Sequence, residues 1–299
     1  MQRHARERQK VVAGRPKKLS LRDEKVISRN VATGVFETAA EAARHASKFL
    51  PTPVSRQTVS RALRRWGLSS VKRKKMHAIS SRNKKIRFKW AKDHRHWTSY
   101  DWNRVVWSDE SKIRRFNSDG LRWSWTRAPG VLNERSITQT EKYGGGGIVV
   151  WGCISKYGVG RICQIVGNMD ATLYVQILSD QLLGSLDQLN LDVGEVIFQQ
   201  DNDSKHVSKL ARKFFSSKDI HVLDWPPQSP DLNPIENVWA HLKKKVARRP
   251  LPARGMTELW EIVQREWAKL TVDYCNSLVE SMPSRVKAVI RAKGGWTKY

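Results

Sequence analysis

Three acidic residues in this 299-residue chain stand at the ends of apolar segments or at the start of a predicted helix. Asp109 follows the apolar run at 105–107, Asp201 follows the run at 196–198, and Glu236 falls near the beginning of a helical segment. Carboxylate oxygens are the ligands that hard cations such as Mg²⁺ prefer. Two divalent ions about 3.5–4 Å apart can activate an attacking oxygen and stabilise a leaving one at a phosphorus centre. If the three side chains converge, they predict metal-dependent phosphoryl transfer.

Each of these acids also has a purely structural interpretation. Asn233 is a good N-cap and Pro234 suits the first helical position, so Glu236 would take the third, where a capping-box glutamate also occurs. An isolated aspartate after a strand, such as Asp109 or Asp201, usually belongs to a turn. The residue types alone leave both interpretations open, and the surrounding motifs must decide between them.

The acids are embedded in three longer motifs. These are WSDES, QQDNDSKH and DWPPQSPDLNPIENVW, in that order, with 34 positions (202–235) between the second acid and the third. Together they resemble the Tc/mariner superfamily of DDE transposases. The spacing and the final Glu are typical of the Tc branch, since the mariner branch ends in Asp. The resemblance covers residues 101–248, including GGGGIVVWGCIS, and continues more weakly over 14–98 as GRPKK and RQTVSRALRRWGL.

This resemblance implies a catalytic domain of the ribonuclease-H-like fold with two Mg²⁺ ions, for which Mn²⁺ can substitute. Asp109 would bridge the two ions, Asp201 would bind one, and Glu236 would bind the other. Water would be the first nucleophile and the freed transposon 3′-hydroxyl the second, so no protein nucleophile is needed. The family implies cut-and-paste transposition from terminal inverted repeats, with insertion at TA dinucleotides.

Polar neighbours of the acids are weaker candidates. Glu110 should point to the opposite face of its strand from Asp109, because side chains alternate along a strand, and we expect it to be structural. Asn202, Asp203 and His206 follow the second acid, and His206 is a candidate to approach the substrate phosphate. The family commonly has Pro-Lys-His-Thr where this chain has Ser-Lys-His-Val at 204–207. The spacing of Asp231 from the second acid is wrong for the family.

Charge is distributed unevenly along the chain. The net charge is +27 and the pI is about 10.4. Residues 1–100 hold 27 Lys and Arg against 6 Asp and Glu (net +21), whereas 101–299 hold 28 against 22 (net +6). Such a basic block predicts a polyanionic partner, and double-stranded DNA is the usual one. The alternative is a ribosomal-type basic protein. The thirteen Trp residues and the mixed strand-like and helical pattern of the long second half make this alternative less suitable.

The three cysteines lack metal-ligand spacing, so neither a disulfide framework nor a zinc site is expected. No apolar run is long enough to span a bilayer and no N-terminal signal is visible, so we expect no membrane association. The basic run at 72–75 is a candidate nuclear-localisation signal or phosphate-contacting strip. The expected location is the nucleus.

A small helix-turn-helix module is predicted within the basic block. Ser20, Thr38 and Ser55 are suited to cap three successive helices, and Gly67 to end the third. The last helix of such a module enters the DNA major groove, and the extended GRPKK segment suits an A·T-rich minor groove, or else is a solvated linker. The predicted DNA contacts are Arg15, Lys17, Lys18, Arg56, Gln57, Thr58, Arg61, Arg64 and Arg65.

Beyond residue 100 the hydrophobic pattern changes from helical to strand-like. A mixed α/β sheet with flanking helices is the predicted fold class. The predicted strands are 105–107, 122–126, 148–154, 159–166, 196–198 and 221–225, and the predicted helices 170–183, 207–215 and 234–246. We expect five segments: a basic arm (1–19), the helix-turn-helix domain (20–75), a basic connecting helix (76–100), the catalytic domain (101–250) and a C-terminal helical extension (251–299).

Two alternatives to an active transposase remain at this stage. One is a catalytically idle or domesticated DNA-binding protein derived from a transposase, and the other is a stand-alone ribonuclease-H-like nuclease. Only thirteen residues precede Gly14, where family members usually carry a further helix-turn-helix. On that basis we expect weak sequence preference in DNA binding. The expected partners are transposon-end DNA, target DNA and a second copy of the chain.

Overall fold

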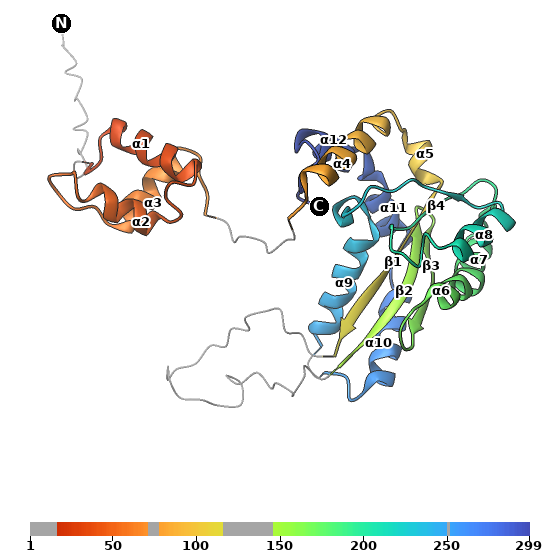
Figure 1. Ribbon diagram of the computed structural model, residues 1–299. Helices are drawn as coiled ribbons and strands as arrows, with labels where there is room; N and C mark the ends of the chain where they lie inside the picture. Colours follow the sequence, from red (N-terminus) through yellow and green to blue (C-terminus); the bar gives the residue numbers. More distant parts are fainter. Residues whose placement is uncertain (1–16, 71–77, 116–145, 250–251) are drawn as a thin grey trace, which may run out of the picture. The chain divides into compact units, whose positions relative to one another are not determined.

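The computed structural model describes residues 17–70, 78–115, 146–249 and 252–299 (Figure 1). The chain divides into two compact units, the first within Met1–His77 and the second within Ala78–Tyr299. The expected strand at 122–126, the basic run at 72–75 and Arg15 lie outside the described residues. None of the described helices is long and apolar enough to cross a membrane.

The first unit contains the three predicted helices. Their bounds are α1 Leu21–Ala32, α2 Ala39–Ala46 and α3 Arg56–Arg65, and the hydroxyl groups of Ser20, Thr38 and Ser55 cap them as expected. Gly67 ends the third helix with φ of +76°, a conformation that favours glycine. A small apolar core lies between the helices, formed by Leu19, Ile27, Phe36, Ala42, Ala43, Val54, Val59, Ala62 and Leu63.

One buried acid ties α1 to the end of α3. Glu24 is only 2% exposed, and it accepts hydrogen bonds from the Arg65 guanidinium and from the indole N–H of Trp66. Trp66 itself is 42% exposed, so it does not join Val59 and Leu63 in the core. The indole uses its polar edge to satisfy Glu24 and leaves its ring partly in solvent.

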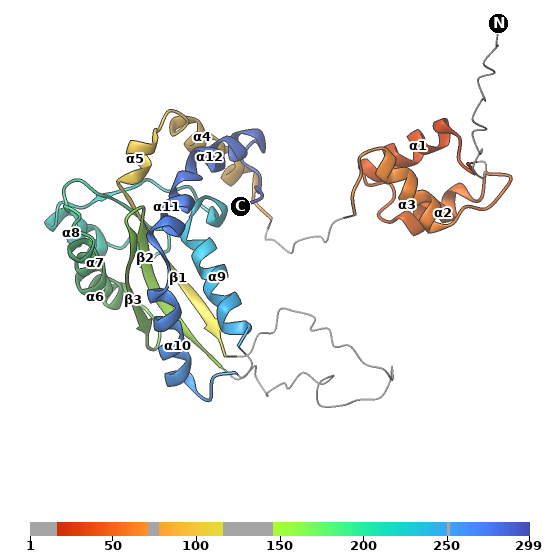
Figure 2. The same ribbon diagram turned by 180° about the vertical axis from the view of Figure 1, so that it is seen from behind.

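A five-stranded mixed sheet forms the centre of the second unit, in the order β3-β2-β1-β4-β5 (Figures 1 and 2). The pairs β1–β2 and β2–β3 are antiparallel, whereas β1–β4 and β4–β5 are parallel. The predicted mixed sheet is therefore present. The strands are β1 Val105–Arg114, β2 Gly147–Ser155, β3 Gly158–Ile165, β4 Ile197–Gln199 and β5 His221–Val222.

Helices cover both faces of this sheet (Figures 1 and 2). One apolar cluster joins Val106, Trp151 and Phe198 of the strands to the α6, α7 and α8 side, and a second joins Val105 and Trp107 to the α9 and α10 side. The helices are α6 Ala171–Ile177, which passes through a π-helical turn at Leu178–Leu182 into α7 Leu183–Gln188, then α8 Lys209–Ser217, α9 Ile235–Ala247, α10 Met256–Ala268, α11 Val272–Glu280 and α12 Met282–Arg291.

The segment expected to be a separate connecting helix is part of the second unit. It forms α4 Ser81–Asp93 and the short α5 Ser99–Asn103. Arg87 of α4 is fully buried, and its guanidinium makes a bidentate pair with Asp231, at 2.8 Å for both nitrogens. It also donates to carbonyl groups of Gly294 and Gly295 beyond α12. The basic sequence of α4 did not indicate that Arg87 would be buried.

Candidate active site

Asp109 lies in the middle of β1, where the sequence had predicted the end of a strand. The parallel pairing of β1 with β4 stops at Trp107, opposite Gln199, but the antiparallel pairing with β2 continues to Arg114. The backbone therefore stays extended, and Asp109 pairs with Gly152 just beyond the end of β4. Alternation along the strand places Asp109 on the same face as Trp107, toward α9 and α10.

Ser108 connects the three segments that carry the acids. Its Oγ donates to the carbonyl group of Gln199 at 2.8 Å, and its N–H donates to the side-chain oxygen of Gln199 at 3.3 Å. Its own carbonyl group accepts a 3.1 Å hydrogen bond from the amide of Asn233. Gln199 lies two residues before Asp201, and Asn233 lies three before Glu236. Sequence reasoning missed Ser108 and Gln199 as organising residues and gave Asn233 only a capping role.

Asp201 follows β4 and is held by a short loop. Its Oδ1 accepts hydrogen bonds from the N–H of Asp203 at 3.0 Å and from Nδ1 of His206 at 2.6 Å. Burial would raise the pKa of Asp201, but the hydrogen bonds from His206 and Asp203 outweigh burial and lower it. The side chain is 57% exposed. Asp201 is therefore a solvent-facing carboxylate whose position is fixed on one side.

Glu236 is in the first turn of α9, as predicted. The helix begins at Ile235, so Glu236 takes the second helical position rather than the third, and it does not close a capping box. The Asn233 side chain instead accepts weakly from the Ile235 N–H, at 3.4 Å. Glu236 therefore does not act as a capping residue of α9.

Asp109, Asp201 and Glu236 line one cleft of about 320 Å³. The other walls are Gln199, Asn202, Asp203, Asn233 and the segment 225–230. Burial, followed by the negative charges of Glu236 and Glu110, raises the pKa of Asp109 well above its ordinary value. Burial also raises the pKa of Glu236, against the opposing effects of Lys243 and of a hydrogen bond with Asp109. The cleft concentrates acidic groups that a bound cation would stabilise in their charged form.

The donor set of the cleft suits hard divalent cations. All three side chains offer carboxylate oxygens, which Mg²⁺ and Mn²⁺ prefer. Among the described residues, no three His, Cys, Asp or Glu side chains converge on a single point that could hold an ion. A pair of ions that share one carboxylate requires only two protein carboxylates for each ion, with the substrate supplying further oxygens. The cleft therefore offers oxygen ligands of the kind that hard divalent ions take.

Glu110 lies on the opposite face of β1 from Asp109, as its position in the strand predicts. There its Oε1 lies 3.2 Å from Nε2 of His206, an ion-pair distance without hydrogen-bond alignment. Burial alone would lower the pKa of His206, but its contacts with Asp201 and Glu110 raise the pKa to about 9. The expectation that His206 approaches a substrate phosphate is not met, because the residue is only 3% exposed.

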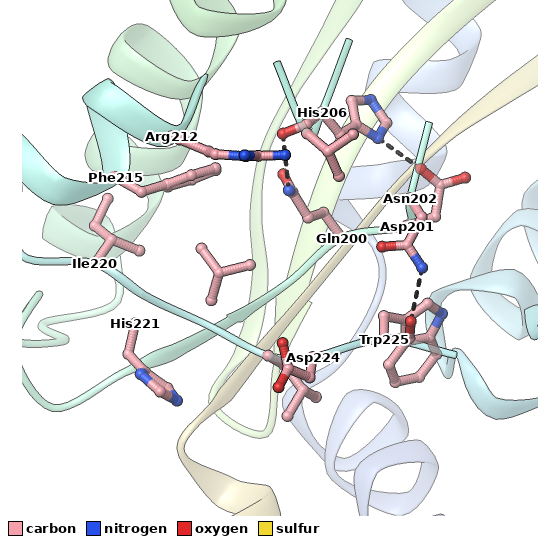
Figure 3. Close-up of a pocket in the computed structure, with 13 residues that line it drawn as sticks. Gln200, Asp201, Asn202, His206, Arg212, Phe215, Ile220, His221, Asp224 and Trp225 are labelled. Carbon is pink, nitrogen blue, oxygen red and sulfur yellow. Dashed lines mark hydrogen bonds and ion pairs between the residues drawn. The ribbon is translucent and has the colours of Figure 1, made fainter. Parts of the chain in front are cut away.

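A second pocket of about 370 Å³ lies beside Asp201, on the side of α8 and β5 (Figure 3). Asn202 lines both this pocket and the acidic cleft, and its side-chain amide donates to the carbonyl group of Trp225 at 2.7 Å. Phe215 and Ile220 form an apolar wall, and the exposed Arg212 reaches over it (Figure 3). The two pockets share Asp201, Asn202 and Trp225 as lining residues.

Of the predicted DNA contacts, those that the structure describes lie on α3 and just before α1, whereas Arg15 lies outside the described residues. The exposed or partly exposed ones on α3 are Arg56, Gln57, Thr58, Arg61, Arg64 and Arg65. Arg65 differs from the others because its guanidinium already pairs with Glu24. Lys17 and Lys18 are exposed ahead of α1, and Lys18 donates to the carbonyl group of Pro53 at 3.2 Å.

Family comparisons match both units of the chain. A family described as DDE superfamily endonuclease matches residues 104–273, which is more than half of the chain and includes all three acids. A second family, described as Transposase, matches residues 26–96 and so includes α3 of the first unit and α4 of the second.

Individual relatives agree with these matches. The transposable element Tcb1 transposase of Caenorhabditis briggsae is 39% identical over 253 residues, covering 83% of this chain and 89% of the relative. The Tc1 transposase of Caenorhabditis elegans is 38% identical over 251 residues, with the same shares. The Tc3 transposase of Caenorhabditis elegans is 30% identical over 290 residues, covering 96% of this chain and 84% of the relative.

Solved structures share the fold at lower identity. A Mos1 transposase paired-end complex with left transposon end has a TM-score of 0.78 and 19% identity, and covers 97% of this chain and 83% of that chain. A Mos1 mariner paired end complex with Mn matches with the same TM-score, identity and coverage. At this identity the likeness is one of fold.

Proposed function

The chain belongs to the Tc/mariner superfamily of DDE transposases, and we propose that it cuts DNA at the inverted repeats of its element and joins the freed ends to target DNA at TA dinucleotides. The observation that carries this proposal is the single cleft lined by Asp109, Asp201 and Glu236. Three carboxylates from β1, the end of β4 and the start of α9 line its walls, although 126 positions separate Asp109 from Glu236.

Two Mg²⁺ ions, or Mn²⁺ in their place, would supply charge stabilisation at phosphorus and activation of the attacking oxygen. Asp109 would hold both ions, Asp201 would hold one through the side of its carboxylate that faces the cleft, and Glu236 would hold the other. Asp109 and Glu236, whose pKa values burial raises, would bind the ions as carboxylates, because only the charged form is a ligand. Ser108 and Asn233 keep the segments bearing the acids at fixed positions during both the cleavage step and the joining step.

DNA recognition is assigned to the first unit. The exposed side chains at 56, 57, 61 and 64 of α3 and the partly exposed Thr58 are suited to the major groove, and Lys17 and Lys18 to the backbone or the minor groove. Arg65 is better explained as the partner of Glu24. Because the Mos1 structures are paired-end complexes, we propose that two copies of this chain act together on two ends. The basic run at 72–75 supports a nuclear location.

Single substitutions in the cleft test the catalytic proposal. Asp109→Asn, Asp201→Asn and Glu236→Gln should each abolish Mg²⁺- or Mn²⁺-dependent strand transfer while leaving DNA binding nearly unchanged. Asp224→Asn is the matched control, since Asp224 is an exposed acid that lines the second pocket but not the acidic cleft. A cleft variant that keeps strand transfer near the unsubstituted rate would remove that residue from the site. DNA binding without any strand transfer by the unsubstituted chain would instead favour an idle DNA-binding protein.

A further inference from the structure

His206 occupies a buried position between two carboxylates from different strands. Its Nδ1 lies 2.6 Å from Oδ1 of Asp201, beyond the end of β4, and its Nε2 lies 3.2 Å from Oε1 of Glu110 on β1. Figure 3 shows the imidazole pointing directly at the Asp201 carboxylate. Glu110 is the neighbour of Asp109, so the imidazole links the two strands that carry the first two acids of the cleft.

The two oxygens of Asp201 are in different environments. Oδ1 already accepts from His206 and from the N–H of Asp203, while no described residue donates a hydrogen bond to Oδ2. We propose that His206 is a positioning residue, which fixes the Asp201 side chain so that Oδ2 is directed into the acidic cleft to bind a divalent cation. This inference rests on the proposed function, because it assumes that Asp201 is a ligand. Groups that orient a ligand in this way commonly change metal affinity or activity by about 10–100-fold when they are removed.

The imidazole is itself held rigidly from three sides. The ring of Tyr174 lies against it, with centroids 4.1 Å apart and an interplanar angle of 35°. The carbonyl group of His206 accepts from the side-chain amide of Gln200 at 3.1 Å, and Gln200 in turn accepts from the Tyr174 hydroxyl at 2.5 Å. With Glu110 at Nε2, the ring has little freedom to rotate away from Asp201. Because the His206 imidazole is held in place by its own contacts, its hydrogen bond can fix the orientation of the Asp201 carboxylate.

The same geometry gives Glu110 a part in the site. Its carboxylate contacts His206 on the face of β1 opposite to the acidic cleft, and it favours the imidazole orientation in which Nδ1 faces Asp201. Glu110 does not line the cleft, so its contact with Asp201 runs through His206.

Two isosteric substitutions separate positioning from simple packing. An Asn side chain places its amide nitrogen near the position of Nδ1, whereas a Gln side chain places it near Nε2. His206→Asn should therefore keep the donor to Asp201, and His206→Gln should lose it while retaining polarity and size. The full-length protein is titrated with Mn²⁺, and free Mn²⁺ is followed by electron paramagnetic resonance. His221→Asn and His221→Gln are matched controls at an exposed histidine of the second pocket.

We expect His206→Gln to weaken Mn²⁺ binding by about 10–100-fold and His206→Asn to stay within a few-fold of the unsubstituted protein. In strand transfer, kcat should fall for the Gln variant while KM for DNA stays constant. Equal Mn²⁺ affinity for the two His206 variants, or a weaker affinity for Asn than for Gln, would overturn the inference. Asp201→Asn is titrated alongside. If it binds Mn²⁺ as tightly as the unsubstituted protein, the assignment of Asp201 as a ligand in the proposed function is wrong.

Discussion

Replacing Arg87 with Met would remove the cation at the centre of a buried network in the second unit. Arg87 and Asp231 are fully or almost fully buried, and they pair through two hydrogen bonds of 2.8 Å. The same guanidinium donates to Ser229 Oγ at 2.8 Å and to the carbonyl groups of three residues, Gln228, Gly294 and Gly295. The substitution keeps most of the side-chain volume but leaves the Asp231 carboxylate without its cation.

The expected cost follows from this burial. Breaking a buried ion pair on one side typically destabilises a protein by about 3–5 kcal/mol, because an uncompensated charge remains inside. The N–H and hydroxyl of Thr297 still donate to Asp231, at 3.2 and 2.9 Å, so we do not expect a larger value. A domain of about 150–250 residues loses roughly 2–4 °C in Tm for each kcal/mol, so the second unit should melt roughly 6–20 °C lower.

Thermal and urea denaturation followed by tryptophan fluorescence measures this loss. Lys85→Met is the matched control, since Lys85 is exposed on the same helix and its substitution should change stability by less than about 0.5 kcal/mol. Combining Arg87→Met with Asp231→Asn should cost less than the sum of the single substitutions, because the unpaired charge is then removed. A loss below about 1 kcal/mol for Arg87→Met would refute the reasoning that this pair anchors α4.

Three further predictions concern the site and the first unit. Asn233→Ala should lower kcat for strand transfer at constant KM for DNA and cost about 1–3 kcal/mol, because the buried Ser108 carbonyl loses its donor. The hydrogen bond from Arg65 lowers the pKa of Glu24, so the unit should be most stable above the ordinary glutamate pKa and lose stability as pH falls through the lowered value; thermal melts of Glu24→Gln should lack this loss. Residues 1–77 should bind duplex DNA with an affinity that falls about 10³–10⁵-fold between 50 and 200 mM salt for six to ten neutralised phosphates, and a flat profile would contradict a DNA role for the first unit.

Much of the fold could be predicted because its signals are local. Capping residues at 20, 38 and 55 determine where three helices begin, and short apolar runs coincide with β2, β3 and β4. The length of β1 could not be predicted in this way. Its residues 108–112 are polar, and they remain extended because β2, more than thirty residues away, continues to pair with them. Tertiary pairing there outweighs the local preference for a turn.

Local sequence signals also failed to predict which residue of α4 is buried. Six of its thirteen residues are Lys or Arg, and such a density of charge usually indicates a solvent-exposed helix. Burying one arginine in such a helix requires partners that lie far away in sequence, here Asp231 and the carbonyl groups after α12. Spacing identified Asp231 as a poor ligand candidate, but nothing local indicated that it pairs with Arg87. The net charge of the first hundred residues therefore predicted a polyanionic partner. It did not indicate which Lys and Arg side chains are buried in the protein and which are exposed to bind that partner.

Within the site, alternation along a strand predicted that Asp109 and Glu110 face opposite sides, and it supplied no partner for Glu110. The partner of Glu110 is His206, which comes after the strand next to β1 in the sheet. That strand, β4, ends two residues before Asp201 and leads directly into the loop that contains His206. The loop can thus reach the face that Glu110 occupies while Asp201 remains in the cleft beside Asp109. The residues that follow β4 thus reach both faces of the sheet, with Asp201 on one face and its positioning residue His206 on the other. Substituting Glu110 should consequently affect metal binding less than substituting His206, since it acts through one more contact.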